Sequence, residues 1–272
     1  MARFDGKHFR GKIGNTSYRV CRNQQLVSGA STKTEFLRTE PMDRSSYLFG
    51  KVSTLNSYIR MYMSPLVDKF HDGEMLGRLN SSTNLAMNAV FNQEQLTFSF
   101  TPDTFNRLAG FEFNIKSRVA DVFLAHLAIT YTEGNVSILI PELTISKQIE
   151  FPSASTKCRI IFSWTHLDLE TGYGQDSELK YISVVKDKKL DLIPAQKVEF
   201  MTEPGCLCII GIGFNFYKDS FIGEVMTNSK EFNPVAILSA HVTDGIHVLP
   251  VEGNWASMHN AKGTIATFKS SK

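Results

Sequence analysis

The sequence lacks an apolar run long enough to cross a bilayer, and it lacks the apolar stretch near Met1 that marks a secretion signal. We therefore expect no membrane partner, and either a cytoplasmic location or release or export by a route other than Sec. Its four cysteines include only one close pair, Cys206 and Cys208, so a zinc site is not indicated. We expect both to pack as small apolar residues on one face of a strand.

The sequence also lacks the G-x-S-x-G elbow and the Cys/His signatures of nucleophilic enzymes. Its best enzyme-like pattern is His166-Leu-Asp168, which would place both side chains on one strand face, as in iron oxygenases. With 7 His and 27 acidic residues in 272, chance supplies this spacing about 0.7 times, and a turn at the glycines that follow is the simpler interpretation. We expect no cofactor and no enzymatic activity.

Positive charge gathers at the N-terminal end. Residues 1–44 contain nine Lys or Arg and four Asp or Glu, a net charge of +5, whereas the whole chain carries +2. Residues 12–27 predict a ribbon of two short strands around a polar turn, and such a ribbon is marginally stable alone. It must dock on its own chain or on another subunit. The residues that we assign to this assembly contact are Arg3, Phe4, Phe9, Gly11, Lys12, Ile13, Gly14, Tyr18 and Val20.

The partner of this ribbon can be a protein or a nucleic acid. Basic residues interleaved with aromatic ones can hold phosphates and stack on bases. However, no nucleic-acid recognition module accompanies them, so protein–protein contacts are favoured. We expect a homo-oligomer.

A helical segment follows the ribbon. Asp43 is a plausible N-cap, and apolar residues recur at helical spacing at Leu48, Val52, Leu55, Ile59, Tyr62 and Leu66. A helix that packs on its own domain is favoured over a coiled coil, because the seam spans fewer than three heptads. Pro65 should kink or restart this helix, and residues 82–91 predict a second one.

From Gln95 onward, the hydrophobic period changes to two, as in strands with one wet face. Asp244-Gly245 predicts a hairpin. The fold class is therefore mainly β (α+β), an antiparallel β-sandwich or two in series. The expected divisions are a basic ribbon and linker at 1–44, a helical segment at 45–92, a sandwich body at 93–252 and a tail at 253–272. The predicted strands are 95–100, 111–116, 122–131, 136–140, 158–164, 179–185, 197–201, 206–217, 235–242 and 246–250.

Several short motifs resemble a family of uncharacterised proteins from Bacteroidota. They are Met1-Ala2-Arg3, Gly11-Lys12-Ile13-Gly14, Met63-Ser64-Pro65-Leu66, Asn84-Leu85-Ala86 with Asn88-Ala89, and the FSW at 162–164. The resemblance covers about a third of the chain and implies a ribbon, helices and a β-rich body. It implies no catalytic residue.

Three hypotheses for function follow. The first is a non-enzymatic structural subunit that self-assembles through its N-terminal ribbon, as in a filament or a phage-tail-like assembly. The second is a β-sandwich module that binds carbohydrate or protein through the loop at 168–176, with Tyr173 in the binding site. The third is a metal-dependent enzyme that uses His166 and Asp168.

Overall fold

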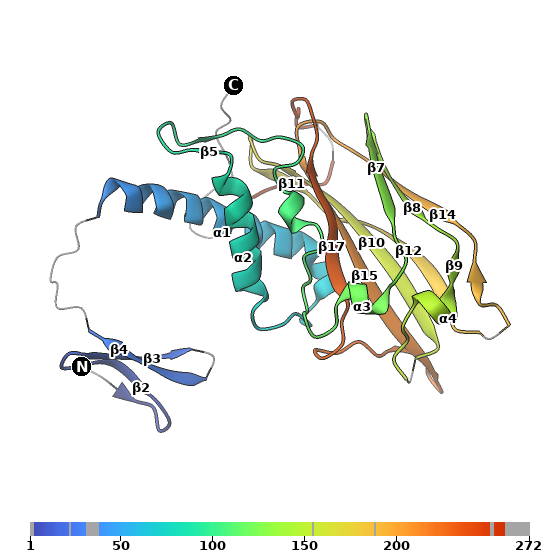
Figure 1. Cartoon of the computed structure of the whole chain (residues 1–272), viewed down its shortest axis with the longest axis horizontal. Coiled ribbons are helices and arrows are strands. Elements are labelled where there is room, and N and C mark those ends of the chain that lie inside the picture. The colour runs from blue at the N-terminus through green and yellow to red at the C-terminus, as the bar shows by residue number, and fades with distance from the viewer. Residues whose placement is uncertain are drawn as a thin grey trace. The chain divides into compact units, whose positions relative to one another are not determined.

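The structure, a computed structural model, describes residues 3–21, 23–30, 38–153, 155–187, 189–250 and 253–258. The chain divides into two compact units, Met1–Asp43 and Arg44–Lys272, and both are shown in Figure 1. Most of the secondary structure is β, in antiparallel sheets, with two long helices. The predicted fold class is confirmed.

The N-terminal unit contains a sheet of four antiparallel strands in sequence order. They are β1 (Arg3–Phe4), β2 (Phe9–Ile13), β3 (Thr16–Cys21) and β4 (Gln24–Gly29). The predicted two-stranded ribbon was therefore too simple. A turn at Gly14 divides its first half into β2 and β3, and Asp5 closes an additional hairpin by accepting the His8 N–H at 2.8 Å.

Two helices open the second unit. Helix α1 (Glu40–Val67) starts three residues before the predicted N-cap, with Pro41 in its first turn, where a missing N–H costs little. Pro65 lies in the last turn, so the helix ends there rather than restarting. All six predicted seam residues are buried in the core of this unit, which confirms packing on its own domain. Helix α2 (Met75–Asn88) begins seven residues earlier than predicted.

The body contains one large sheet and one smaller one. In the large sheet, β10 (Lys157–Asp168) and β15 (Leu207–Ser220) pair along eleven residues, with β12 (Glu178–Val185) beyond β10 and β17 (Val235–Val242) beyond β15. The smaller sheet has the order β14 (Gln196–Met201), β8 (Asn135–Ile140), β7 (Ala128–Thr132). The remaining elements are β5 (Phe91–Asn92), β6 (Thr97–Phe98), η1 (Asn106–Leu108), α3 (Val119–Val122), β9 (Leu143–Thr144), α4 (Ile145–Gln148), β11 (Tyr173–Gln175), β13 (Leu192–Ile193), β16 (Gly223–Met226) and β18 (Trp255–Ser257).

The second unit has three layers, which Figure 1 shows as helices, large sheet and small sheet. The helices cover one face of the large sheet, where Leu55 and Ile59 share a core with Ile209. The small sheet covers the other face, where Phe162 and Phe214 share a core with Ile138. The layers are close enough to require glycine, because a Cβ at Gly211 would lie 2.3 Å from the Met63 Cε. Cys206 and Cys208 are buried in the second core, as predicted.

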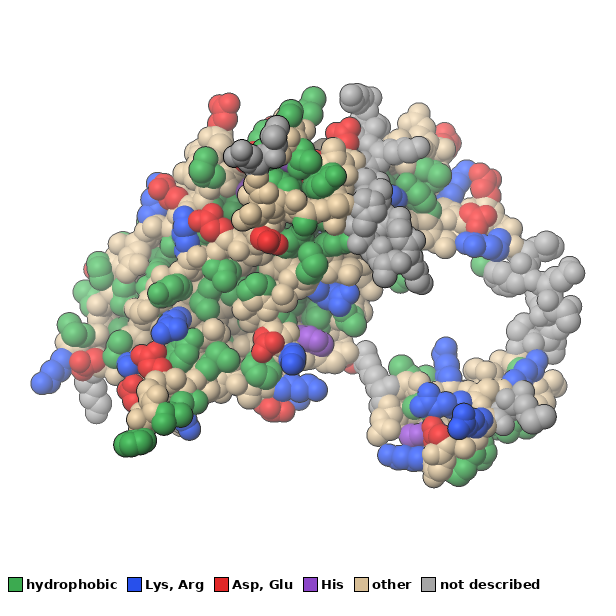
Figure 2. Space-filling view, turned by 180° about the vertical axis from the view of Figure 1, so that it is seen from behind, with side chains coloured by type: hydrophobic (Ala, Val, Ile, Leu, Met, Phe, Trp, Pro, Cys, Tyr) green, Lys and Arg blue, Asp and Glu red, His purple; other side chains and the backbone are tan. Residues whose placement is uncertain are grey.

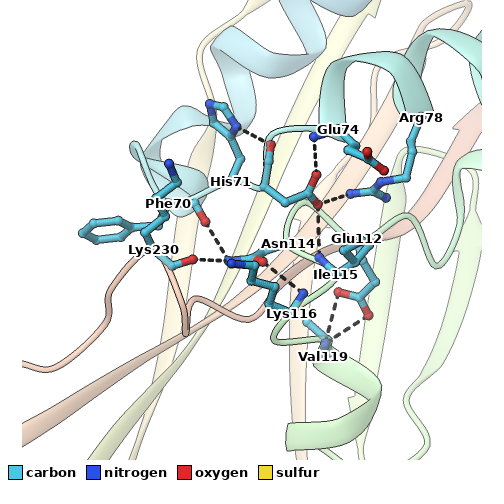
Figure 3. A network of polar contacts seen from close by, with 11 residues as sticks. Phe70, His71, Glu74, Arg78, Glu112, Asn114, Ile115, Lys116, Val119 and Lys230 are labelled. Carbon is cyan, nitrogen blue, oxygen red and sulfur yellow. Dashed lines mark hydrogen bonds and ion pairs between the residues drawn. The ribbon is translucent and has the colours of Figure 1, made fainter. Parts of the chain in front are cut away.

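Four predicted strands are wrong in whole or in part. Residues 95–100 contain only the two-residue strand β6, and Leu96 lies in the turn before it with a φ of +54°. Residues 111–116 form a loop that touches β17 through one isolated bridge, and polar groups hold it in place. Figure 3 shows Asn114 donating to the Phe70 and Lys230 carbonyls at 3.0 and 2.9 Å, and Glu112 accepting the Val119 N–H at 3.0 Å. Residues 122–131 contain the end of α3 and four of the five residues of β7, so only their last part is a strand. Residues 246–250 form no strand.

Candidate functional site

The N-terminal sheet has one apolar face. Gly11 pairs with Tyr18, and Tyr18 pairs with Val27, so the side chains of Tyr18 and Val27 lie on the same side. Ile13 and Val20 alternate onto this side as well. The rings of Phe4 and Phe9 join it, because their centroids are 4.8 Å apart and Phe9 lies 5.7 Å from Tyr18.

This apolar face is open to solvent in the structure. The exposed fractions are 55% for Phe4, 51% for Ile13 and 59% for Val27. A single sheet of about two dozen residues has no second layer to bury such side chains. The sheet therefore exposes a surface of the kind that marks contact with another molecule.

The opposite face of the sheet is basic. Lys12 and Arg19 alternate onto it, together with the exposed Cys21. Figure 2 shows Lys and Arg side chains gathered on this unit. The Asp5 carboxylate bonds to the Arg10 guanidinium at 3.0 Å, and its pKa is lowered to about 2, chiefly by the His8 N–H and then by Arg10.

The outer edge of β4 is also unpaired among the described residues. The Ala30 N–H donates to the Asn15 carbonyl at 2.6 Å, so alternation directs the backbone groups of Ser28 and Leu26 toward β3. The N–H and C=O groups of Gln25, Val27 and Gly29 consequently point away from the sheet. An edge of this kind is a template for pairing with another strand.

All nine residues of the predicted assembly contact lie in this sheet or in its turns. Phe4, Phe9 and Tyr18 form the aromatic cluster, and Ile13 and Val20 extend its face. Arg3 and Lys12 are exposed. Gly11 and Gly14 have φ values of +106° and +54°, which suit glycine, so their role is to shape the backbone. Sequence reasoning missed Val27, whose pairing with Tyr18 places it on the same face.

His166 and Asp168, the predicted metal ligands, are both buried at the end of β10. The His166 Nε2 accepts hydrogen bonds from the Trp164 indole and from the Glu203 N–H, each at 3.1 Å, and Nδ1 lies 2.7 Å from the Gln175 Oε1. Burial lowers the pKa of His166 to about 4. The ring is therefore a neutral structural group with both nitrogens in use.

Asp168 forms the turn that follows β10. Its Oδ1 accepts the N–H groups of Glu170 and Thr171 at 2.9 and 3.0 Å, as the glycine-rich sequence after it indicated. Its Oδ2 lies 2.9 Å from the Nδ1 of His247, whose ring packs on Trp255 at 4.3 Å. The described residues contain no group of three or more His, Cys, Asp or Glu side chains placed to hold a metal ion.

The contact between Asp168 and His247 was missed because the predicted hairpin at Asp244-Gly245 is wrong. The chain turns there, but residues 246–250 form no strand, and His247 enters the interior. The two residues are 79 positions apart, and no local pattern signals such a contact.

Tyr173, the predicted binding residue, is half-buried in β11, where it pairs with Asp168 and with Ser257 of β18.

No family model, curated protein or solved structure matches this chain. The resemblance to the Bacteroidota proteins therefore stays a prediction. Within the described ranges, no helix combines the length and the apolar character that a membrane crossing requires.

Proposed function

We propose that this protein is a structural subunit that assembles with copies of itself through its N-terminal sheet, without catalysis. One observation carries the proposal. The four strands of Arg3–Gly29 form a sheet of their own, with an exposed apolar face and an unpaired outer edge at β4.

The physical argument concerns what this sheet cannot do by itself. A small single-layer sheet buries little apolar surface, and its folding has to overcome a conformational entropy cost of about 1–2 kcal/mol per residue. Contact with a second molecule would cover Phe4, Ile13 and Val27 and give the β4 backbone groups hydrogen-bond partners. The second unit has two cores of its own and does not share this need.

The experiment compares two charge insertions on the same strand. Val27→Lys places an ammonium group on the apolar face, and Ser28→Lys places the same group on the opposite face, which is already basic. Light scattering after size exclusion, with negative-stain microscopy, should show oligomers for the wild type and for Ser28→Lys, and monomers for Val27→Lys.

A truncated chain of residues 38–272 provides a second arm. It should remain folded and be monomeric, because both cores lie within it. A monomeric full-length protein would refute the proposal. So would a truncated protein that forms the same oligomer as the full chain.

A further inference from the structure

Strand β12 forms one edge of the large sheet. Strand β12 pairs with β10 over eight residues, and the described residues provide no strand on its other side. Strand β11 pairs with the end of β10 on the same side as β12, and β18 pairs with the outer edge of β11. The outer edge of β12 has no such neighbour among the described residues. The opposite edge, β17, is lined by the loop at 110–113, which exchanges backbone bonds with Val235 and Ile237.

The directions of the β12 backbone groups follow from its neighbours. The Lys186 N–H donates to the Thr156 carbonyl at 2.8 Å, so the even-numbered residues of β12 bond to β10. The N–H groups of Leu179, Tyr181 and Ser183 therefore point outward. Three apolar side chains stand along the same strand, with Leu179 45% exposed, Tyr181 64% and Val185 51%.

We propose that β12 of one copy accepts β4 of another copy by antiparallel or parallel strand addition, which would join the N-terminal sheet to the large sheet of the neighbour. This inference rests on the proposed self-assembly and names the surface that receives the N-terminal sheet. Gln25, Val27 and Gly29 would supply about six outward backbone groups to match those of β12.

The other open edges of the body fit this role less well. Strand β14 carries Lys197 and Glu199 in an ion pair, and charged side chains on an edge discourage pairing with a further strand. Strand β7 (Ala128–Thr132) is five residues long, against eight for β12. Only β12 combines length with a row of exposed apolar side chains among the described strands.

The two faces of the sheets match in character. Leu179, Tyr181 and Val185 lie on the side of β12 away from the small sheet, whereas Ile182 and Val184 face the core between the sheets. If β4 pairs with β12 so that its apolar face lies beside Tyr181, then the basic face of the N-terminal sheet lies on the side of the large sheet that the small sheet covers. An acidic hollow opens there.

This hollow has a volume of about 400 Å³ and lies between the start of β12 and the end of β14. Its walls include Asp176, Glu178 and Glu203. Glu178 pairs with Lys180 at 3.1 Å, while no described basic side chain forms an ion pair with Asp176 or Glu203. These carboxylates complement the Lys and Arg side chains of the N-terminal sheet.

The test uses proline to remove one outward N–H from each proposed partner. Ser183→Pro changes the acceptor, and Val27→Pro changes the donor. Neither N–H bonds within its own sheet, and proline is tolerated at sheet edges. Ser183→Thr and Val27→Thr are the controls, since threonine retains the N–H and suits a strand. Each proline variant should weaken assembly by about tenfold or more, measured by sedimentation equilibrium, with the threonine variants close to wild type.

Mixing the two proline variants gives the sharpest result. The Ser183→Pro chain retains its donor strand, and the Val27→Pro chain retains its acceptor edge. Equal amounts should form 1:1 dimers that grow no further, since each dimer has used its one intact pair. A different outcome would be that the wild type and Ser183→Pro assemble and Val27→Pro does not. This result would refute the role of β12 as the acceptor strand, while self-assembly through the N-terminal sheet would still hold. A monomeric wild type would refute both.

A charge reversal that leaves the backbone unchanged covers the case in which Ser183→Pro fails to fold. Glu203→Lys in the acidic hollow should weaken assembly, whereas Glu133→Lys, at the turn between β7 and β8, should not. Equal effects of the two reversals would count against the acidic hollow as part of the contact.

Discussion

The buried imidazole of His166 should make the protein less stable in mild acid. Burial lowers its pKa from 6.5 to about 4, and its Nε2 already accepts two hydrogen bonds, which protonation would break. Below its unfolded pKa, the unfolded chain binds a proton at this residue that the folded chain does not. The contribution of His166 to the free energy of unfolding is therefore fully present above about pH 6.5 and is lost as the pH decreases toward 4.

The size of this effect follows from the two pKa values. Between about pH 7.5 and pH 5, His166 alone should reduce the free energy of unfolding by about 2 kcal/mol. Urea unfolding at both pH values measures the loss in the wild type and in His166→Gln. The variant starts from lower stability, but its loss between the two pH values should be smaller by about 2 kcal/mol.

The matched control is His126→Gln, which replaces an exposed histidine in the segment between α3 and β7. It should lose as much stability on acidification as the wild type. If His166→Gln and the wild type lose equal free energy between the two pH values, then the proposed neutral, buried state of this ring is wrong.

Two further predictions concern packing and a buried carboxyl. Gly211→Ala should lower the free energy of unfolding by about 1–3 kcal/mol, because its Cβ would collide with Met63, whereas Gly50→Ala, with open space around it, should raise it by about 0.5–1 kcal/mol. Urea unfolding of both variants provides the comparison, and a stabilised Gly211→Ala would contradict the close approach. Burial raises the pKa of Glu112 to about 7, although the hydrogen bond from the Val119 N–H opposes this shift. The contribution of Glu112 to the free energy of unfolding is therefore lost as the pH rises from about 4.5 to 7, opposite in sign to that of His166. Glu112→Gln should remove about 1–3 kcal/mol of that loss, and an unchanged pH profile would refute it.

The sequence predicted those elements whose hydrophobic pattern follows continuous burial, on one face in α1 and on both faces in β15. The seam of α1 and the alternation in β10, β12, β15 and β17 are of this kind, and each agrees with the structure within a few residues. The segment at 111–116 shows why alternation alone can mislead. Phe111 and Phe113 are buried and bond to β17 through their backbone groups, yet only one isolated bridge forms there. The chain beyond it is held by side-chain bonds from Asn114 to distant carbonyl groups.

The candidate sites show the same division between local and distant signals. The aromatic and basic residues of the N-terminal sheet could be selected from the sequence, because they alternate within a short stretch. The open edge of β12 could not, since an edge is defined by which strands are absent from one side. The neighbours of His166 were likewise hidden, because Gln175 and Glu203 reach it from separate elements.

The distribution of thiols gives this protein a convenient probe position. Cys158, Cys206 and Cys208 are buried, and burial raises the pKa of each, so they should react slowly with alkylating dyes. Cys21 is exposed on the N-terminal sheet. A maleimide fluorophore should therefore label that sheet selectively in the native protein, and energy transfer between differently labelled batches would report the docking of subunits in real time without any engineered residue.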